Sequence, residues 1–89
     1  MKDLYISTKA KKDIKLYRNN KELMGELWDV IYKLRIGEEL PASFRKHKLT
    51  GQYKNCLECH VRGDSLLIWI EDERINVLRF GSHSELFGK

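Results

Sequence analysis

Three strand-like segments follow one another closely in the last part of the chain. Residues 53–62 and 74–80 alternate between apolar and polar side chains, and residues 64–71 between them are strongly apolar. The connections, Gly63-Asp64 and Glu71-Asp72-Glu73, are short enough to be hairpin turns, which join only antiparallel strands. The pattern therefore predicts a three-stranded antiparallel meander, and any fold of this chain has to be built around it.

Two helices are predicted before this meander. Ser7 or Thr8 can cap the first, whose apolar residues recur at helical spacing, and Asn19-Asn20 ends it. The second covers about residues 21–35, ends at Gly37, and carries an apolar stripe of Leu23, Leu27, Ile31 and Leu34. Joined by so short a break, the two helices are expected to form an antiparallel pair.

The remaining segments complete a β-α-α-β-β-β layout. Leu4-Tyr5-Ile6 is a β-branched and aromatic run that predicts a short first strand. Residues 38–52 lose all periodicity and are expected to form a loop, and residues 81–89 a short tail. The predicted fold class is α+β, an antiparallel sheet with a helical hairpin packed on one face. With 89 residues, the chain has room for one domain, residues 1–89.

Charge is distributed unevenly along the chain. Residues 1–54 contain 13 Lys or Arg and 7 Asp or Glu, whereas residues 55–89 contain 4 and 6. A basic half indicates nucleic acid or an acidic protein as a partner, although a helix kept basic for solubility would look the same. No apolar run is long enough for a signal peptide or a membrane span, so we expect a cytoplasmic protein without membrane contact.

Residues 55–60 read NCLECH, which contains the C-x-x-C-H pattern of c-type haem attachment and the C-x-x-C pattern of zinc or redox sites. In a strand, however, Cys56 and Cys59 point to opposite faces, Cys59 with Tyr53 toward the helices and Cys56 toward the other face. They could then neither bind one metal together nor form a disulfide. We therefore expect no metal and no cofactor here, and interpret Cys59 as a small buried residue.

His60 belongs to the polar face of the same strand, close to Asp64 at the turn. The other two histidines, His47 in the preceding loop and His83 in the tail, can both approach one edge of the sheet. Acid–base cleavage of RNA needs such groups: one removes the proton of the 2′-hydroxyl, another protonates the departing 5′-oxygen, and a cation stabilises the phosphorane. Imidazole can make both proton transfers near neutral pH.

Three segments resemble motifs of one toxin family. Residues 44–51, FRKHKLTG, resemble the F-x-x-H-x-L-x-G loop of YafQ-type toxins in the RelE/ParE superfamily. Residues 59–64, CHVRGD, followed by LLIW at 66–69, resemble their hairpin. Residues 78–87, LRFGSHSELF, resemble their L-x-R-x-G-[ST]-H-x-x-L-F ending. The motifs occur in order with the family's spacing, and the RelE-like layout covers the whole chain.

The resemblance implies an endoribonuclease, an mRNA interferase that is the toxin of a type II toxin–antitoxin system and cleaves mRNA, commonly at the ribosome. It also implies a cognate antitoxin protein as partner. The family's functional residues fall on His47, His60, Asp64, Arg79, His83 and Phe87. His83 is expected to be the general acid, and His60, His47 and Asp64 to share the tasks of proton acceptance and orientation. Phe87 is expected to stack on a base or to place His83.

The resemblance and the alternation of side chains leave further expectations to test. By alternation, Arg79 lies on the same face as Val77 and Ile75, from where it would stabilise the scissile phosphate. Glu58 is interpreted as part of a surface ion pair with Lys54 or Arg62, and Ser65 stands where relatives often have an aromatic residue. RNA phosphates are expected to bind Arg45, Lys46, Lys48, Lys54 and the lysines of the first helix.

Two other functions compete with the nuclease. One is a ParE-like toxin of the same superfamily that lacks nuclease residues and acts by binding a protein target. The other is a basic RNA-binding module without catalysis. The three histidines favour the nuclease, because a protein that only binds has no need of them.

Overall fold

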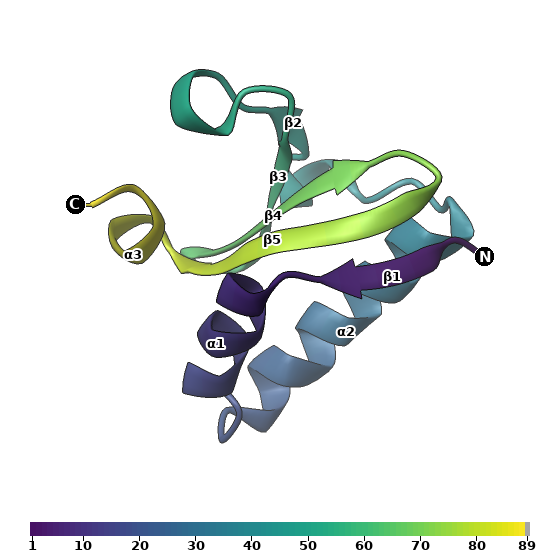
Figure 1. Cartoon of the computed structure of the whole chain (residues 1–89). Helices are drawn as coiled ribbons and strands as arrows, with labels where there is room; N and C mark the ends of the chain where they lie inside the picture. Colours follow the sequence, from purple (N-terminus) through teal and green to yellow (C-terminus); the bar gives the residue numbers. More distant parts are fainter. Residues whose placement is uncertain (89) are drawn as a thin grey trace.

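A five-stranded sheet forms the centre of the structure, a computed structural model that describes residues 1–88 (Figure 1). The strand order is β1-β5-β4-β3-β2. Strands β3, β4 and β5 pair antiparallel with one another, which confirms the predicted meander. The strands are β1 (Asp3–Ile6), β2 (His47–Lys48), β3 (Leu57–Arg62), β4 (Ser65–Glu71) and β5 (Arg74–Ser82).

The first strand departs from the prediction of a purely antiparallel sheet. β1 lies at one edge and runs parallel to β5, with Leu4 opposite Ile75 and Ile6 opposite Val77. A parallel neighbour needs a long crossover, and the helical hairpin and the meander together provide it. The sheet is therefore mixed, with one parallel pair at the edge that leads into the helices.

Two helices cover one face of the sheet, α1 (Thr8–Leu16) and α2 (Lys21–Ile36), and they run in opposite directions as predicted (Figure 1). The Ser7 side chain accepts a hydrogen bond from the backbone of Ala10, and that of Asn20 caps α2. Gly37 ends α2 in the left-handed conformation, at φ 78°, that glycine adopts most readily. None of the helices within residues 1–88 is long and apolar enough to cross a membrane.

The main core lies between these helices and the sheet. The predicted stripe on α2 is buried there, together with Val30 of the same helix and Ala10 of α1. From the sheet, β3, β4 and β5 contribute the facing side chains Cys59, Val61, Leu67, Trp69, Ile75, Val77 and Phe80. Alternation along the strands thus places one set of apolar residues against the helices.

The other face of the sheet was predicted to be open, because its side chains on the first strand of the meander are polar. In the structure this face is covered. Leu66 and Ile68 of β4 are buried in a second cluster with Cys56 and Leu86, and Tyr53 packs against it. Two segments expected to lack regular structure provide this cover. The loop contains short 3-10 turns, η1 (Ala42–Phe44) and η2 (Gly51–Tyr53), besides β2, and the tail forms a helix, α3 (His83–Phe87). Tyr53 of η2 and Leu86 of α3 pack on this face, whereas Phe44 of η1 packs against the main core.

The two cysteines lie in different clusters, as predicted. Cys59 packs in the main core under the helices and Cys56 in the second cluster, and both are free thiols. Burial raises the pKa of Cys59 to about 12, so it stays protonated. The prediction that Tyr53 shares the helix side with Cys59 is wrong. Strand β3 begins only at Leu57, and the η2 turn brings Tyr53 to the second cluster.

Truncation of a core side chain should show how much the helical layer contributes to stability. Leu27 is 0% exposed, so Leu27→Ala should lower the free energy of unfolding by about 2–5 kcal/mol, because it leaves a cavity between α2 and the sheet. Leu16→Ala is the matched control, since that side chain is 75% exposed, and it should change stability by less than about 0.5 kcal/mol. Urea denaturation followed by circular dichroism measures both, and equal effects would contradict this packing.

Candidate active site

Four residues line up across the sheet on the face away from α1 and α2. The register pairs His47 of β2 with Glu58 of β3, Glu58 with Ile68 of β4, and Ile68 with Arg79 of β5. Since neighbouring strands are about 4.8 Å apart, this row spans about 14 Å. Ile68 in the middle is buried, so the polar ends of the row lie on either side of the second cluster.

A β-bulge decides where Arg79 points. Trp69 pairs with Val77 and Ile68 with Arg79, so Leu78 is an extra residue on β5. Ile75, Val77 and Phe80 therefore belong to the main core, whereas Leu78 packs against the second cluster. The prediction that Arg79 shares a face with Val77 and Ile75 is wrong, because the extra residue interrupts the alternation. Arg79 instead lies opposite Ile68 and reaches Tyr53, whose hydroxyl oxygen is 3.4 Å from Nη1.

Asp13 of α1 holds the Arg79 guanidinium through two hydrogen bonds. The Nε atom donates to Oδ2 at 2.7 Å and Nη2 to Oδ1 at 3.2 Å, and the backbone N–H of Phe80 also donates to Oδ2 at 3.0 Å. The hydrogen-bonded carboxylate raises the pKa of Arg79 above its usual value. Sequence reasoning did not single out Asp13, although it is the one acidic residue within α1, a helix that has four lysines.

His47 and Glu58 contact each other on the other side of the cluster. His47 Nε2 lies 3.1 Å from Glu58 Oε1, and His47 Nδ1 donates to the carbonyl oxygen of Arg45 at 2.6 Å. Glu58 is only 5% exposed, and its Oε2 has no hydrogen-bond partner within residues 1–88. The interpretation of Glu58 as half of a surface ion pair with Lys54 or Arg62 is wrong. The pairing of β2 with β3 covers Glu58 and gives it His47 as partner.

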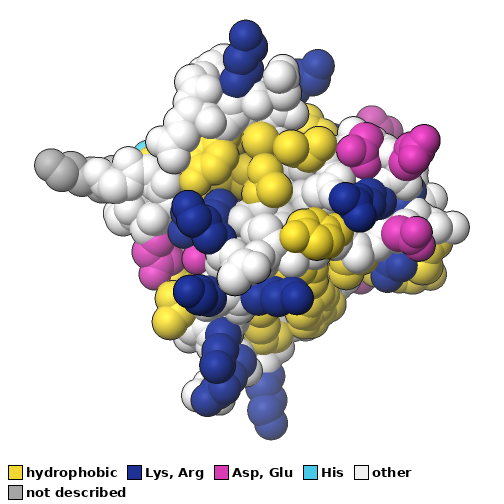
Figure 2. Space-filling view, in the orientation of Figure 1, with side chains coloured by type: hydrophobic (Ala, Val, Ile, Leu, Met, Phe, Trp, Pro, Cys, Tyr) yellow, Lys and Arg dark blue, Asp and Glu magenta, His cyan; other side chains and the backbone are white. Residues whose placement is uncertain are grey.

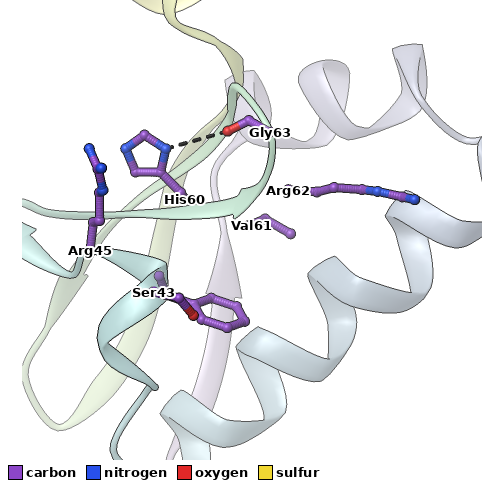
Figure 3. A pocket seen from close by; sticks show the side chains of 7 residues that line it. Ser43, Arg45, His60, Val61, Arg62 and Gly63 are labelled. Carbon is purple, nitrogen blue, oxygen red and sulfur yellow. Dashed lines mark hydrogen bonds between the residues drawn. The ribbon is translucent and has the colours of Figure 1, made fainter.

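His60 follows Glu58 by two residues on β3. It lines a hollow of about 450 Å³ between η1 and the β3–β4 turn (Figure 3). Its Nδ1 donates to the carbonyl oxygen of Gly63 at 3.4 Å. Arg45 flanks the His60 ring, whereas Arg62 points toward α2, where it pairs with Glu22 and Glu26 at 3.5 Å each. Of the two arginines at this hollow, Arg45 is therefore the one available to an anionic ligand.

His83 and Phe87 are the first and last residues of α3. Their rings lie 4.8 Å apart, and the Phe87 ring also makes an edge-to-face contact with Tyr53 at 5.6 Å. The Tyr53 hydroxyl, which accepts a hydrogen bond from Arg79, connects these aromatic rings to the guanidinium. The helix begins with a capping box, in which the Ser82 and Glu85 side chains each bond the other's backbone N–H. The S-x-x-E pattern at residues 82–85 could have revealed the helix from sequence alone.

The remaining candidates lie in the β3–β4 turn and in the segment before β3. Asp64 is exposed in the β3–β4 turn, and its charge contributes to the raised pKa of Tyr17. Lys46 lies 4.0 Å from Glu71, at the far end of β4, and Lys48 and Lys54 are exposed. Figure 2 shows lysine and arginine side chains gathered over α1. Within residues 1–88, no group of three or more His, Cys, Asp or Glu could hold a metal ion.

The family of the chain is settled by comparison with known proteins. Residues 2–88 match the family model for YafQ, the bacterial toxin of a type II toxin–antitoxin system. The chain belongs to the YafQ family of toxins. The match covers nearly the whole sequence, which agrees with the resemblance seen in the three motifs.

Relatives of this YafQ-family toxin are similar over almost their full length. It is 32% identical to the mRNA interferase toxin YafQ of Escherichia coli K12 over 90 residues, covering 98% of this chain and 97% of the relative. A metal-bound toxin from Helicobacter pylori superposes with a TM-score of 0.88 at 32% identity, covering 98% and 100%. The E. coli DinJ–YafQ toxin–antitoxin complex contains a chain with a TM-score of 0.85 at 31% identity, covering 98% of both.

Removal of the charge on Asp13 should test how far Arg79 depends on it. Asp13→Asn should lower the free energy of unfolding by about 1.5–3 kcal/mol, because it weakens two charged hydrogen bonds in a partly buried place. Asp29→Asn is the control, since that residue makes an exposed i,i+4 pair worth less than about 0.5 kcal/mol. Thermal unfolding of both variants provides the comparison, and equal losses would mean that Asp13 does not anchor Arg79.

Proposed function

We propose that this toxin, a YafQ-family mRNA interferase, cleaves RNA by attack of the 2′-hydroxyl on the adjacent phosphate. In this step the 2′-oxygen forms a bond to phosphorus and the bond from phosphorus to the 5′-oxygen breaks. A base takes the proton of the 2′-hydroxyl, and an acid gives a proton to the departing 5′-oxygen. The products are a 2′,3′-cyclic phosphate and a 5′-hydroxyl. The placement of Arg79, three histidines and Phe87 around one face of the sheet supports this assignment.

His60 is the general base in this proposal. The carbonyl oxygen of Gly63 can only accept a hydrogen bond, so Nδ1 of His60 carries the proton toward it. In the neutral ring, Nε2 then has the lone pair that can accept a proton from the 2′-hydroxyl. Asp64, at the same turn, is proposed to orient the substrate or to assist this proton transfer.

His47 has a different role, because both of its ring nitrogens face acceptors. Nδ1 faces the carbonyl oxygen of Arg45 and Nε2 faces the Glu58 carboxylate, so each nitrogen is positioned to donate to an acceptor within the protein. In this arrangement it has no lone pair to act as a base. We assign it to stabilising negative charge on the phosphorane, together with Arg79.

His83 is assigned as the general acid, and the basic side chains as the contacts to RNA. His83 is exposed at the start of α3, and its ring lies against Phe87, which is 37% exposed and available for stacking on a base. Arg45 in the hollow next to His60, together with Lys46, Lys48, Lys54 and the lysines of α1, would bind phosphates.

Two partners follow from the same proposal. The solved DinJ–YafQ complexes support a cognate antitoxin protein for this chain as well. An antitoxin that covers the basic face of the toxin would block access to RNA. The substrate is mRNA, and the ribosome is proposed as the place of cleavage, where the lysines of α1 could contact ribosomal RNA.

Removal of the proposed general acid should abolish most of the activity. His83→Ala should lower the rate of mRNA cleavage by about 100-fold or more, while RNA binding persists. Ser84→Ala, a change of the neighbouring exposed residue in α3, should keep the wild-type rate. Cleavage is followed in a translating extract and with mRNA on purified ribosomes, and the product ends are analysed. Intact mRNA with the wild-type toxin would refute the nuclease, and a 3′-hydroxyl product would refute attack by the 2′-hydroxyl.

Replacement by arginine should separate the roles of His47 and His60. His47→Arg keeps a cation at the position of the proposed charge stabiliser and should retain at least about tenfold more activity than His47→Ala. His60→Arg supplies a side chain that cannot accept a proton, so it should be as inactive as His60→Ala. Single-turnover cleavage rates of the four variants decide between the roles. A rescue at position 60, or none at position 47, would reverse the assignment.

A further inference from the structure

Helix α3 carries the proposed general acid, yet it is too short to be stable alone. It has five residues, far fewer than an isolated helix needs in water. His83 is its first residue and Phe87 its last. The contacts that hold α3 against the rest of the molecule therefore determine where the His83 ring lies.

Two of these sets of contacts lie on the face of the sheet that carries α3. Leu86 is 5% exposed and anchors the helix in the second cluster. The Ser82 backbone N–H donates to Glu85 Oε1 at 2.8 Å, and the Glu85 N–H donates to Ser82 Oγ at 3.2 Å. These contacts start the helix and hold its apolar side, but they do not connect α3 to the helical layer on the other face of the sheet.

The third contact provides that connection. Tyr17, the C-cap residue that follows α1, donates its hydroxyl to Glu85 Oε1, the same oxygen that accepts the Ser82 N–H. The Tyr17 ring lies edge-on to Phe80 of β5, at 5.6 Å and 78°. The two partners are 68 residues apart in sequence, so this hydrogen bond ties the first helix to the last.

The electrostatics fix which partner donates. Burial and the hydrogen-bonded Glu85 raise the pKa of Tyr17 to about 12, and the charges of Asp64 and Asp13 add to this effect. The hydrogen bonds from the Ser82 backbone and from Tyr17 lower the pKa of Glu85, and Arg79 lowers it further. At any working pH, a neutral hydroxyl thus faces an ionised carboxylate, which is the favourable arrangement for a charge-assisted hydrogen bond.

Gly81 makes room for the Glu85 carboxylate. A Cβ atom at position 81 would lie 2.8 Å from Glu85 Oε1, which is closer than real Cβ contacts come. The carboxylate is the end of a flexible side chain, so an alanine there would displace it rather than disturb the strand. Glycine at this position is thus a condition for the contact between Glu85 and Tyr17.

We propose that Tyr17 and Glu85 are positioning residues for catalysis, a latch between α1 and α3 that sets the place of His83. The proposal rests on the proposed function in one respect, the assignment of His83 as general acid. A misplacement of about 1 Å at a reacting group can cost two orders of magnitude in rate, so loss of the latch should be visible in the chemical step.

The test compares Tyr17→Phe with Tyr32→Phe. Tyr17→Phe keeps the ring against Phe80 and removes only the hydroxyl, while Tyr32 is 52% exposed on α2 and serves as the matched control. At a temperature where circular dichroism shows every variant folded, the single-turnover rate of Tyr17→Phe should fall about tenfold or more, with RNA affinity unchanged. An unchanged rate, or a fall only in affinity, would overturn the proposal.

A second pair of variants breaks the latch from the other side. Gly81→Ala should displace the Glu85 carboxylate and lower the rate by a similar factor, whereas Gly25→Ala, which has open space around it, should not. Because both changes remove one contact, the double variant Tyr17→Phe/Gly81→Ala should be no slower than the slower single variant. Multiplying effects would show that the two residues act separately and would overturn the latch.

A spectroscopic measurement separates the latch from the proposed function. Proton–nitrogen correlation spectra of the imidazole rings report the surroundings of His83, including the ring of Phe87. Tyr17→Phe should shift the His83 signals and Tyr32→Phe should not, whether or not the toxin cleaves RNA in the assay. Identical His83 signals in the wild type and in Tyr17→Phe would overturn the latch, while shifted signals with an inactive wild type would leave it standing and refute the nuclease.

Discussion

The carboxylate of Asp13 attaches the first helix to the strand that carries much of the candidate site. Strand β1 ends at Ile6, opposite Val77, so β5 continues beyond its parallel neighbour. Beyond that point, side chains from the start and middle of α1 replace β1 as hydrogen-bond partners of β5. Ser7 Oγ donates to the carbonyl oxygen of Leu78, and Asp13 accepts from the Phe80 N–H. The same carboxylate holds Arg79. Because β1 ends before Arg79 is reached, α1 can approach β5 there, and its Asp13 fixes the guanidinium of Arg79.

The bulge at Leu78 and the hydrogen bonds of Asp13 depend on each other. Without an extra residue in β5, alternation would put Arg79 among Val77 and Ile75 under the helices, where a guanidinium would lack water. With the extra residue, Phe80 lies in the main core and Arg79 contacts Tyr53 on the other face. A bulge next to a functional side chain is a common way in which a sheet redirects that side chain.

The sequence predicted most of the fold because its signals there are local. Caps at Ser7 and Asn20, the stripe on the second helix and the short connections of the meander depend on near neighbours in the chain. The separation of Cys56 from Cys59 followed from alternation in the same way. Family motifs then named residues that lie around one face of the sheet. The membership of the family confirms that resemblance.

Most of the failures share a cause, since they depend on contacts between separate segments of the chain. The direction in which the Arg79 side chain points depends on Asp13, 66 residues away. The burial of Glu58 depends on the two-residue strand that begins with His47. Tyr53 turns to the second cluster because α3 and the loop cover a face that seemed open. The α3 helix is the exception, because its capping box is local and could have been read from Ser82 and Glu85.

The three histidines differ in how many ring nitrogens the fold occupies, and this difference bears on the proposed chemistry. Both nitrogens of His47 face acceptors and one nitrogen of His60 does, whereas the His83 ring packs against the ring of Phe87. A general acid has to lose its proton and regain it, and a fixed acceptor on the reacting nitrogen would oppose that cycle. The ring of such a residue is better held by stacking and by the backbone that carries it. For His83 that backbone is α3, so control of its position falls to contacts such as those of Leu86 and Glu85, which do not touch the imidazole.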